Sequence, residues 1–208
     1  MEQERAATLA PGGLTWATWC RIDTEGRSAA DKAKLEELAW KVVEFRNAVK
    51  QGLEPRWLVL LGPTGIGKTW IAERLFKALT LRLGRGKCNW EPHEIFWPAL
   101  EPRVTGKLAE LEMTRKLRDM RSWPILYLDD IYSSEDPWGD KSAALFSLLG
   151  DRVGKWTILT SNKTINDIQR EDPRMADRML RGENVVWNCE KMESYSVLKK
   201  KRENLAGV

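Results

Sequence analysis

The feature that most constrains this chain is the octapeptide GPTGIGKT, residues 62–69, which follows the apolar run WLVLL and opens a helical pattern. It matches the pattern G-x-x-x-x-G-K-[ST] in the expected context of strand, loop and helix. Glycines let such a loop curl so that successive backbone N–H groups surround phosphate oxygens, and the following helix adds its positive N-terminal end. The sequence therefore predicts a phosphate-binding loop, called the P-loop below.

The P-loop predicts ATP and Mg²⁺ as cofactors. Lys68 is expected at the surface of the site, where its ammonium reaches the β- and γ-phosphates, and the Thr69 hydroxyl is expected to ligate Mg²⁺. All eight loop residues are candidate nucleotide contacts: Gly62, Pro63, Thr64, Gly65, Ile66, Gly67, Lys68 and Thr69.

Two further apolar runs end in polar side chains. In ILYLDDI, residues 125–131, Asp129 is expected to hold the magnesium shell and Asp130 to orient or deprotonate the attacking water. In TILTSN, residues 157–162, Asn162 ends a strand that would lie beside the γ-phosphate, where its amide would hold the water. These residues are therefore predicted to complete a catalytic site.

Apolar runs that alternate with helical patterns predict an α/β fold with a mostly parallel five-stranded sheet. A helix is expected from Ser28 or Asp31 to Gly52. Strands are expected at Trp57–Leu61, Glu94–Trp97, Ile125–Leu128, Thr157–Thr160 and Asn184–Trp187, and helices at about 67–83, 106–121, 139–153, 164–170 and 173–181. This predicts an N-terminal arm and helix over 1–52, a nucleotide-binding domain over 53–190 and a basic tail over 191–208.

The segment DPRMADRMLRG, residues 172–182, places Arg174 and Arg178 four residues apart on one face of a helix, with Arg181 three further on. Nucleotide switches use a guanidinium to stabilise γ-phosphate charge, often from a neighbouring subunit. The segment is therefore expected to supply such a guanidinium.

GPTGIGKT, ILYLDDI, TSN and DPRMADRML, in this order and spacing, resemble the AAA+ ATPases of the DnaC/DnaI helicase loaders and their transposition relative IstB, over about residues 35–198. The resemblance implies a three-layer P-loop domain preceded by a short helical arm. It assigns Walker A to residues 62–69, Walker B to Asp129 and Asp130, and sensor 1 to Asn162. It makes Arg178 the arginine finger and Arg174 a nucleotide-facing neighbour.

The resemblance also implies partners. Family members form ATP-dependent open spirals, with ATP between subunits and single-stranded DNA along the inner face, and they act on a replicative helicase or, for IstB, with a transposase. Walker B in the family is usually Asp-Glu. The shorter Asp-Asp pair of this chain predicts slow or DNA-stimulated hydrolysis with ATP binding retained. Only about 50 residues precede the P-loop strand, so we expect a reduced partner-binding arm, as suits a phage or mobile element.

The composition favours a soluble cytoplasmic protein. The 208 residues carry a net charge of only +4, so a nucleic-acid surface has to be a local patch, for which the basic segment 103–121 is the candidate. Three widely spaced cysteines predict no disulfide framework. The N-terminus has no apolar signal region, and no apolar run is long enough to cross a membrane.

Two other classes stay open on the sequence alone. A rolling-circle replication initiator also has a P-loop, an Asp-Asp pair and a strand ending in Ser-Asn, but it needs an upstream histidine-containing nuclease domain, and the single histidine here is His93. A small-molecule kinase would use the arginines as a phosphate-clamping lid, but it needs an acceptor pocket that the sequence does not identify.

Overall fold

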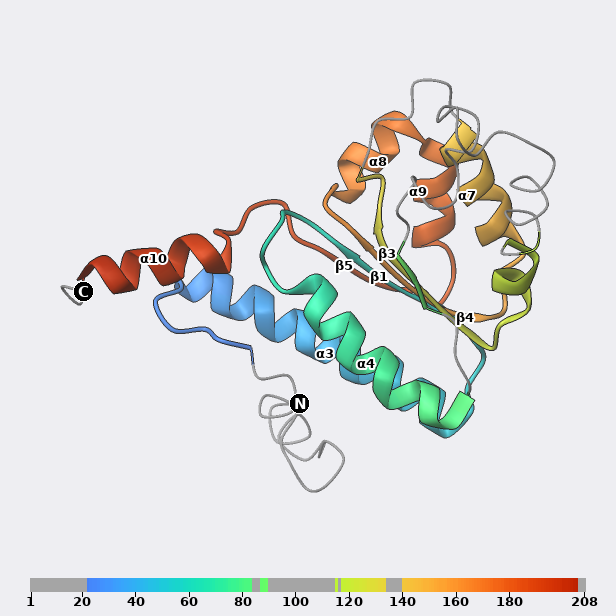
Figure 1. Ribbon diagram of the computed structural model, residues 1–208, viewed down its shortest axis with the longest axis horizontal. Helices are drawn as coiled ribbons and strands as arrows, with labels where there is room; N and C mark the ends of the chain where they lie inside the picture. The colour runs from blue at the N-terminus through green and yellow to red at the C-terminus, as the bar shows by residue number, and fades with distance from the viewer. Residues whose placement is uncertain (1–21, 84–86, 90–114, 116, 134–139, 206–208) are drawn as a thin grey trace, which may run out of the picture.

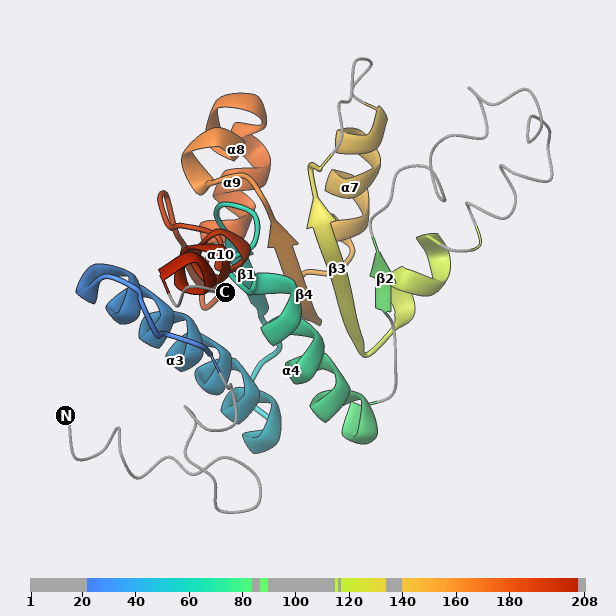
Figure 2. The ribbon, with the colours of Figure 1, turned by 60° about the vertical axis from the view of Figure 1, so that its left-hand side comes forward.

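A parallel sheet of five strands lies at the centre of the computed structural model, which describes residues 22–83, 87–89, 115, 117–133 and 140–205. The strands are β1 (Trp57–Leu61), β2 (Lys87–Asn89), β3 (Ile125–Ile131), β4 (Trp156–Ser161) and β5 (Val185–Asn188), in the spatial order β2-β3-β4-β1-β5. Every neighbouring pair is parallel. The predicted fold class is confirmed, and the carboxyl ends of the strands meet at one edge (Figure 2).

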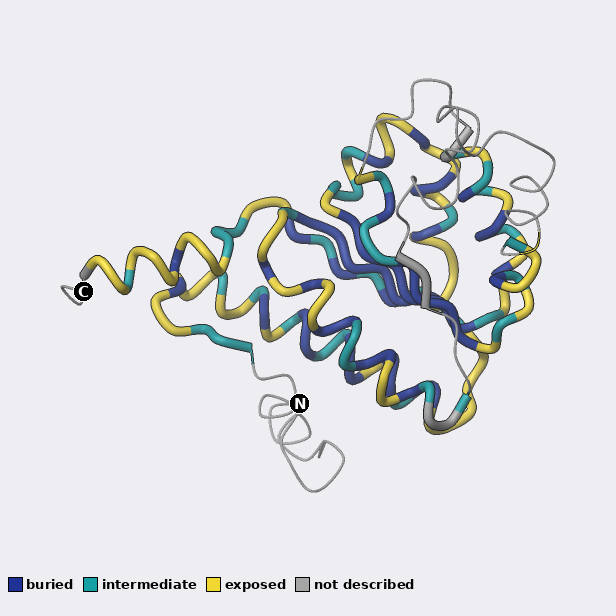
Figure 3. Tube along the Cα trace, viewed as in Figure 1, coloured by how far each residue is buried: buried dark blue, intermediate teal, exposed yellow. Residues whose placement is uncertain are grey.

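Helices cover both faces of the sheet, which gives three layers (Figure 1). Helices α3 (Ala29–Gln51) and α4 (Lys68–Leu83) pack on one face, and α7 (Asp140–Gly150), α8 (Ile165–Glu171) and α9 (Pro173–Leu180) lie on the other. Each face of the sheet has its own apolar core. The central strands are buried on both sides (Figure 3), which explains why they appear in the sequence as unbroken apolar runs.

Helix ends follow the signals in the sequence. The Ser28 side chain caps α3 by accepting from the Asp31 amide, and Gly52 ends it in the left-handed conformation, at φ 68°. Thr164 and Asp167 form a reciprocal capping box at the start of α8, and Asp172 caps α9, in which Pro173 is the first residue. Helices α4, α7, α8 and α9 therefore begin within a few residues of their predicted starts.

The structure differs from the sequence-based expectations in β2 and in the C-terminal segment. Strand β2 is a short edge strand, Lys87–Asn89. Its sequence has no apolar run, so no strand was expected there. The strand expected at Glu94–Trp97 lies outside the described residues, as does most of the basic segment 103–121, of which the described residues, 115 and 117–121, are helical. The residues expected to form a tail include a regular helix, α10 (Tyr195–Leu205), which extends beyond the edge of the sheet (Figure 1).

Within the described ranges, no helix is both long and apolar enough to cross a lipid bilayer.

Candidate nucleotide-binding site

The P-loop lies between the end of β1 and the start of α4, and two of its glycines are required by its geometry. Gly62 has φ 136°, and a Cβ there would lie 2.5 Å from the Cys189 carbonyl oxygen. Gly65 has φ 77°, and its Cβ would meet the Ser194 Cβ at 2.8 Å. The segment that follows β5 therefore packs directly against the loop, and only glycine allows both the backbone angles and this close approach.

Two backbone hydrogen bonds fix this packing. The Cys189 amide donates to the Leu61 carbonyl at 3.0 Å, and the Tyr195 amide donates to the Gly65 carbonyl at 2.9 Å. The chain therefore continues from β5 along the P-loop and into α10. The resemblance included this segment, but nothing in its composition indicated that it forms a wall of the site.

Lys68 connects the P-loop to the end of β4. Its Nζ donates to the Gly62 and Pro63 carbonyls, both at 2.8 Å, and to Asn162 Oδ1 at 3.1 Å. The side chain is only 5% exposed, so the expectation that Lys68 lies at the surface of the site is wrong. Burial lowers the pKa of Lys68 to about 8, while the carboxylates of Asp130 and Asp129 act in the opposite direction.

The two predicted carboxylates lie beside the P-loop. Asp129 Oδ1 accepts from the Thr69 hydroxyl at 3.0 Å, which places together the two predicted magnesium ligands. Asp130 Oδ1 accepts from the Asn162 amide at 2.6 Å, which joins the two residues expected to hold the attacking water. The structure thus brings together all the residues of the first three motifs, from strands β1, β3 and β4.

Asp130 has an unusual backbone. Its φ is 56°, in the left-handed region, and the pairing of β3 with β4 shifts register between Leu128 and Ile131. Asp and Asn occupy this region more readily than other non-glycine residues. The bulge turns the second carboxylate toward Asn162, which gives a local reason for an aspartate at this position.

These groups line a cavity of about 690 Å³. Its other walls come from Trp70 on α4, from Tyr195 and Ser196 on α10, and from the N-terminal segment, which contributes Ile22, Asp23 and Arg27. Sequence reasoning missed this N-terminal contribution, because residues 1–27 show no period.

Arg27 and Arg202 hold the two ends of the described chain together. Arg27 is 7% exposed, and one of its terminal nitrogens donates to the Glu193 carbonyl at 2.9 Å. Arg202 on α10 pairs with Asp23 at 3.0 Å and with Glu25 at 3.3 Å. The N-terminal segment and α10 therefore close the same side of the cavity.

The donor set suits Mg²⁺. A threonine hydroxyl and a carboxylate are hard oxygen ligands, and protein-bound Mg²⁺ commonly uses one or two carboxylates plus substrate phosphates and waters. Among the described residues there is no cluster of three His, Cys, Asp or Glu side chains that would make a self-contained metal centre. Thr69 and Asp129 therefore fit an ion that is bound together with a nucleotide.

Arg174 and Arg178 lie on α9, on the other side of the sheet from α3 and α4, and Arg181 follows the end of that helix. Arg178 donates to the Phe146 carbonyl at 2.6 Å, and its guanidinium stacks 3.8 Å from the centre of the Phe146 ring. The Arg174 guanidinium lies 4.8 Å from the same ring. Together with Arg181 they surround a second hollow, which shares no lining residue with the P-loop cavity.

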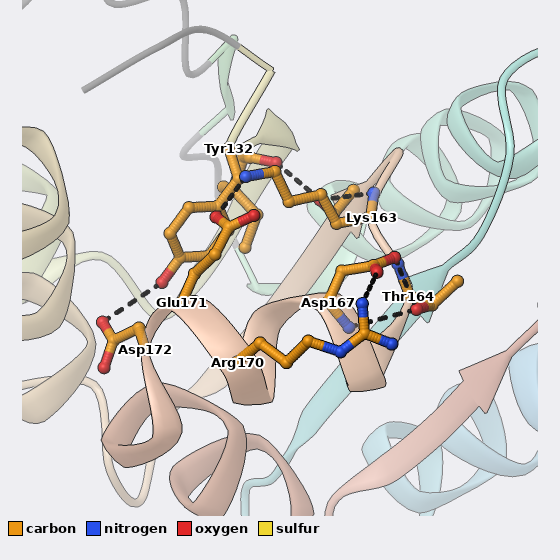
Figure 4. Close-up of polar contacts among 9 residues, drawn as sticks. Tyr132, Lys163, Thr164, Asp167, Arg170, Glu171 and Asp172 are labelled. Atoms are coloured by element: carbon orange, nitrogen blue, oxygen red, sulfur yellow. Dashed lines mark hydrogen bonds and ion pairs between the residues drawn. The ribbon is translucent and has the colours of Figure 1, made fainter. Parts of the chain in front are cut away.

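The helix pair α8–α9 is held to the sheet by polar contacts (Figure 4). The Tyr132 hydroxyl donates to Asp172 Oδ2 at 3.4 Å, and Lys163 pairs with Glu171 while its ammonium lies 5.5 Å from the Tyr132 ring centre. These contacts fix the position of α9 and hence of its arginines, at a separate place from the P-loop.

The family follows from comparison with known proteins. A family model described as IstB-like ATP binding protein matches residues 21–204. The chain belongs to this family. It is therefore an ATP-binding protein of the AAA+ class, and the resemblance noted in its motifs is confirmed.

Solved structures agree with this fold. The DnaC helicase loader is 20% identical, with a TM-score of 0.54, over 82% of this chain and 99% of that one. DnaI is 19% identical, with a TM-score of 0.53, over 81% and 92%. The replication initiator DnaA, bound to AMPPCP and single-stranded DNA, is 17% identical, with a TM-score of 0.55, over 81% and 51%. The chain has no match among curated protein sequences.

Proposed function

We propose that this protein is a Mg²⁺-dependent AAA+ ATPase that assembles on single-stranded DNA with ATP at its subunit interfaces and loads a replicative helicase. The observation that carries the proposal is the cavity in which the P-loop meets Asp129, Asp130 and Asn162. A phosphate-binding loop without these partners would only bind a nucleotide. With them, the site also has groups suited to hold a metal ion and a water.

Each residue has a role that its contacts support. The P-loop amides and Lys68 hold the phosphates, and Thr69 and Asp129 hold Mg²⁺. When bound, Mg²⁺ neutralises charge on the β- and γ-phosphates. Asp130 and Asn162, which contact each other at 2.6 Å, orient the attacking water, and Asp130 is the group that accepts its proton.

The nucleotide of one subunit meets the arginines of the next. Arg178 and Arg174 lie on a different surface from the P-loop of their own chain, as a residue that acts across a subunit boundary must. A homo-oligomer in which Arg178 faces the γ-phosphate of a neighbouring subunit would complete the site. Assembly would then depend on ATP.

The proposal that the partner is a helicase is supported by the structural alignment. This chain aligns with nearly the full length of the solved DnaC and DnaI structures. A second candidate is supported by the family model, whose IstB name points to a transposition regulator that acts with a transposase. The ATP site is the same in both cases, so the partner has to be identified directly.

Two measurements test the proposal. ATP turnover should rise when single-stranded DNA is added, and it should disappear in Lys68→Ala. Turnover that rises with a small phosphate acceptor and ignores DNA would point to a kinase instead. Pulldown with the full chain should then retain a replicative helicase in preference to a transposase, and the opposite preference would favour the transposition regulator.

A further inference from the structure

Tyr127 lies on β3 two residues before Asp129, and the two side chains point to the same face of the sheet because alternate residues of a strand do so. Tyr127 is completely buried. Its hydroxyl donates to Asp129 Oδ1 at 2.7 Å and lies 3.5 Å from the Thr69 carbonyl oxygen. The buried Tyr127 hydroxyl thus contacts the Asp129 carboxylate, which is the Mg²⁺ ligand in the proposed function.

Three donors converge on the same carboxylate oxygen. Besides Tyr127, the hydroxyls of Thr160 and Thr69 donate to Asp129 Oδ1, at 2.6 and 3.0 Å. The Thr160 oxygen accepts from the Asp130 amide at 2.8 Å, so its hydroxyl hydrogen is directed at Asp129. Within the described part of the chain, every hydrogen bond that the Asp129 carboxylate accepts ends on Oδ1, which fixes the carboxylate plane and leaves Oδ2 for another partner.

The Tyr127 hydroxyl donates to a carboxylate rather than to a neutral acceptor. Burial and the neighbouring Asp129 carboxylate raise the pKa of Tyr127 above its usual value. The hydroxyl holds Oδ1 by a charge-assisted hydrogen bond, which is stronger than a bond between neutral groups.

We propose that Tyr127 is a positioning residue for magnesium: its hydroxyl orients the Asp129 carboxylate for metal binding. The inference rests on the proposed function, since it assumes that Asp129 serves a nucleotide-bound ion. Groups that orient a metal ligand in this way commonly contribute about 10–100-fold to metal affinity.

If Tyr127 had only a structural role, its replacement by phenylalanine would have a different effect. The Tyr127 ring packs 5.8 Å from the Phe76 ring, in the core between α4 and the sheet. If packing were the only role, phenylalanine would replace tyrosine with no effect on the metal. The decisive group is therefore the hydroxyl, and Tyr127→Phe removes it while keeping the ring.

The experiment measures the affinity of the full chain for a non-hydrolysable ATP analogue by calorimetry, first in EDTA and then across a range of free Mg²⁺ concentrations. For Tyr127→Phe we expect the affinity in EDTA to stay within about twofold of wild type. The Mg²⁺ concentration that gives half of the increase in affinity should rise by about tenfold or more.

Tyr132→Phe is the matched control. Tyr132 follows the same strand, and its hydroxyl also donates to a carboxylate, that of Asp172, which lies outside the P-loop cavity. This variant should show the wild-type Mg²⁺ requirement. An equal change in both variants would mean that loss of any hydroxyl in this region disturbs the site, and the specific role of Tyr127 would be wrong.

The remaining outcomes separate the two claims. A wild-type chain that binds no nucleotide in EDTA or in Mg²⁺ contradicts the proposed function. Normal nucleotide binding with an unchanged Mg²⁺ requirement in Tyr127→Phe overturns the positioning role alone. If Tyr127→Phe does not fold, Tyr127→Leu also removes the hydroxyl and keeps an apolar side chain at this buried strand position, and an unchanged Mg²⁺ requirement there overturns the proposal equally.

Discussion

Lys68 Nζ lies 3.1 Å from Asn162 Oδ1, so the P-loop amine and the amide at the tip of β4 are in direct contact across 94 residues of sequence. Asn162 in turn donates to Asp130 at 2.6 Å. Three motifs that the sequence shows separately therefore form one connected hydrogen-bond network. A change at any of the three should alter how the other two are held.

Lys68→Ala should remove nucleotide binding. The variant loses the charge that faces the phosphates, and it also leaves the Gly62 and Pro63 carbonyls without their Lys68 donor. Because these two carbonyls lose a hydrogen bond, we expect a small fall in stability, on the order of 1 kcal/mol, in an otherwise intact fold. Calorimetric titration with ATP and thermal unfolding check the two effects. Wild-type affinity in the variant would contradict the P-loop assignment.

The affinity for nucleotide should fall as the pH rises above about 8. Because burial lowers the pKa of Lys68 to about 8, the free protein loses this proton as the pH passes that value. Bound phosphate favours the charged form of Lys68, so above this pH Lys68 has to take up a proton when the nucleotide binds. The affinity for nucleotide should then fall by a factor that approaches ten for each further pH unit. Lys68→Arg should bind without this dependence, since guanidinium stays charged. Proton uptake can be measured by calorimetry in buffers of different ionisation enthalpy.

Asp130→Asn should keep ATP affinity and lose hydrolysis. Asparagine tolerates the left-handed backbone at φ 56°, so the fold is expected to stay intact while the proton acceptor is lost. Phosphate release and ATP titration measure the two properties. Asp130→Glu is a useful comparison, because glutamate keeps the charge but is less suited to this backbone. Full hydrolysis by Asp130→Asn would show that another group activates the water.

Arg178→Ala should bind ATP with nearly normal affinity and lose ATP-driven assembly and most hydrolysis. In other P-loop systems such an arginine increases the rate of hydrolysis by about 10³–10⁵-fold. Light scattering and phosphate release give the two readouts. Arg170→Ala removes an exposed arginine of the neighbouring helix α8 and should have no effect.

Mixing provides the control for Arg178. Protomers of Arg178→Ala combined with protomers of Lys68→Ala should recover part of the activity, because an intact arginine then faces an intact P-loop at some interfaces. Normal hydrolysis by Arg178→Ala alone would mean that the arginine only packs on Phe146.

Arg152→Ala should destabilise the fold by about 3 kcal/mol or more, because it removes a buried donor from three backbone carbonyls. Arg152 is completely buried, and its guanidinium donates to the Met120, Trp123 and Trp156 carbonyls and to the Thr157 hydroxyl. Urea unfolding measures the loss. Arg152→Lys keeps the charge but reaches fewer acceptors, so its stability should be intermediate. A wild-type midpoint in both variants would contradict this role.

Features that depend on apolar pattern and glycine were predictable. Strand β1 has the predicted bounds, and β3, β4 and β5 differ by a few residues. Polar residues continue each of these three strands past the end of its apolar run: Asp129 and Asp130 in β3, Ser161 in β4 and Asn188 in β5. The P-loop, the carboxylates and Asn162 lie together because parallel strands put their carboxyl ends at one edge of a sheet, and their catalytic roles stay a prediction.

Features that depend on tertiary contact were not predictable. Tyr127 looks like one more apolar residue of its strand, and Arg152 looks like an exposed charge after a helix. Only the folded chain shows that a carboxylate and three carbonyls lie within their reach. The Lys-rich sequence of α10 has no apolar period, so neither its helix nor its position beside the P-loop could be inferred.

The central position of β1 has a consequence for synthesis of the protein. Its two neighbours are β4, paired from Trp57 with Thr157, and β5, paired from Leu58 with Val185. A ribosome makes the chain from the N-terminus at about 5–20 residues per second. The strand that supports the P-loop therefore has no partner until about a hundred more residues have been added, and its second partner comes later still. Prematurely terminated products that end before β4 carry the complete GPTGIGKT motif without its scaffold, and they should expose both edges of β1 to chaperones and proteases.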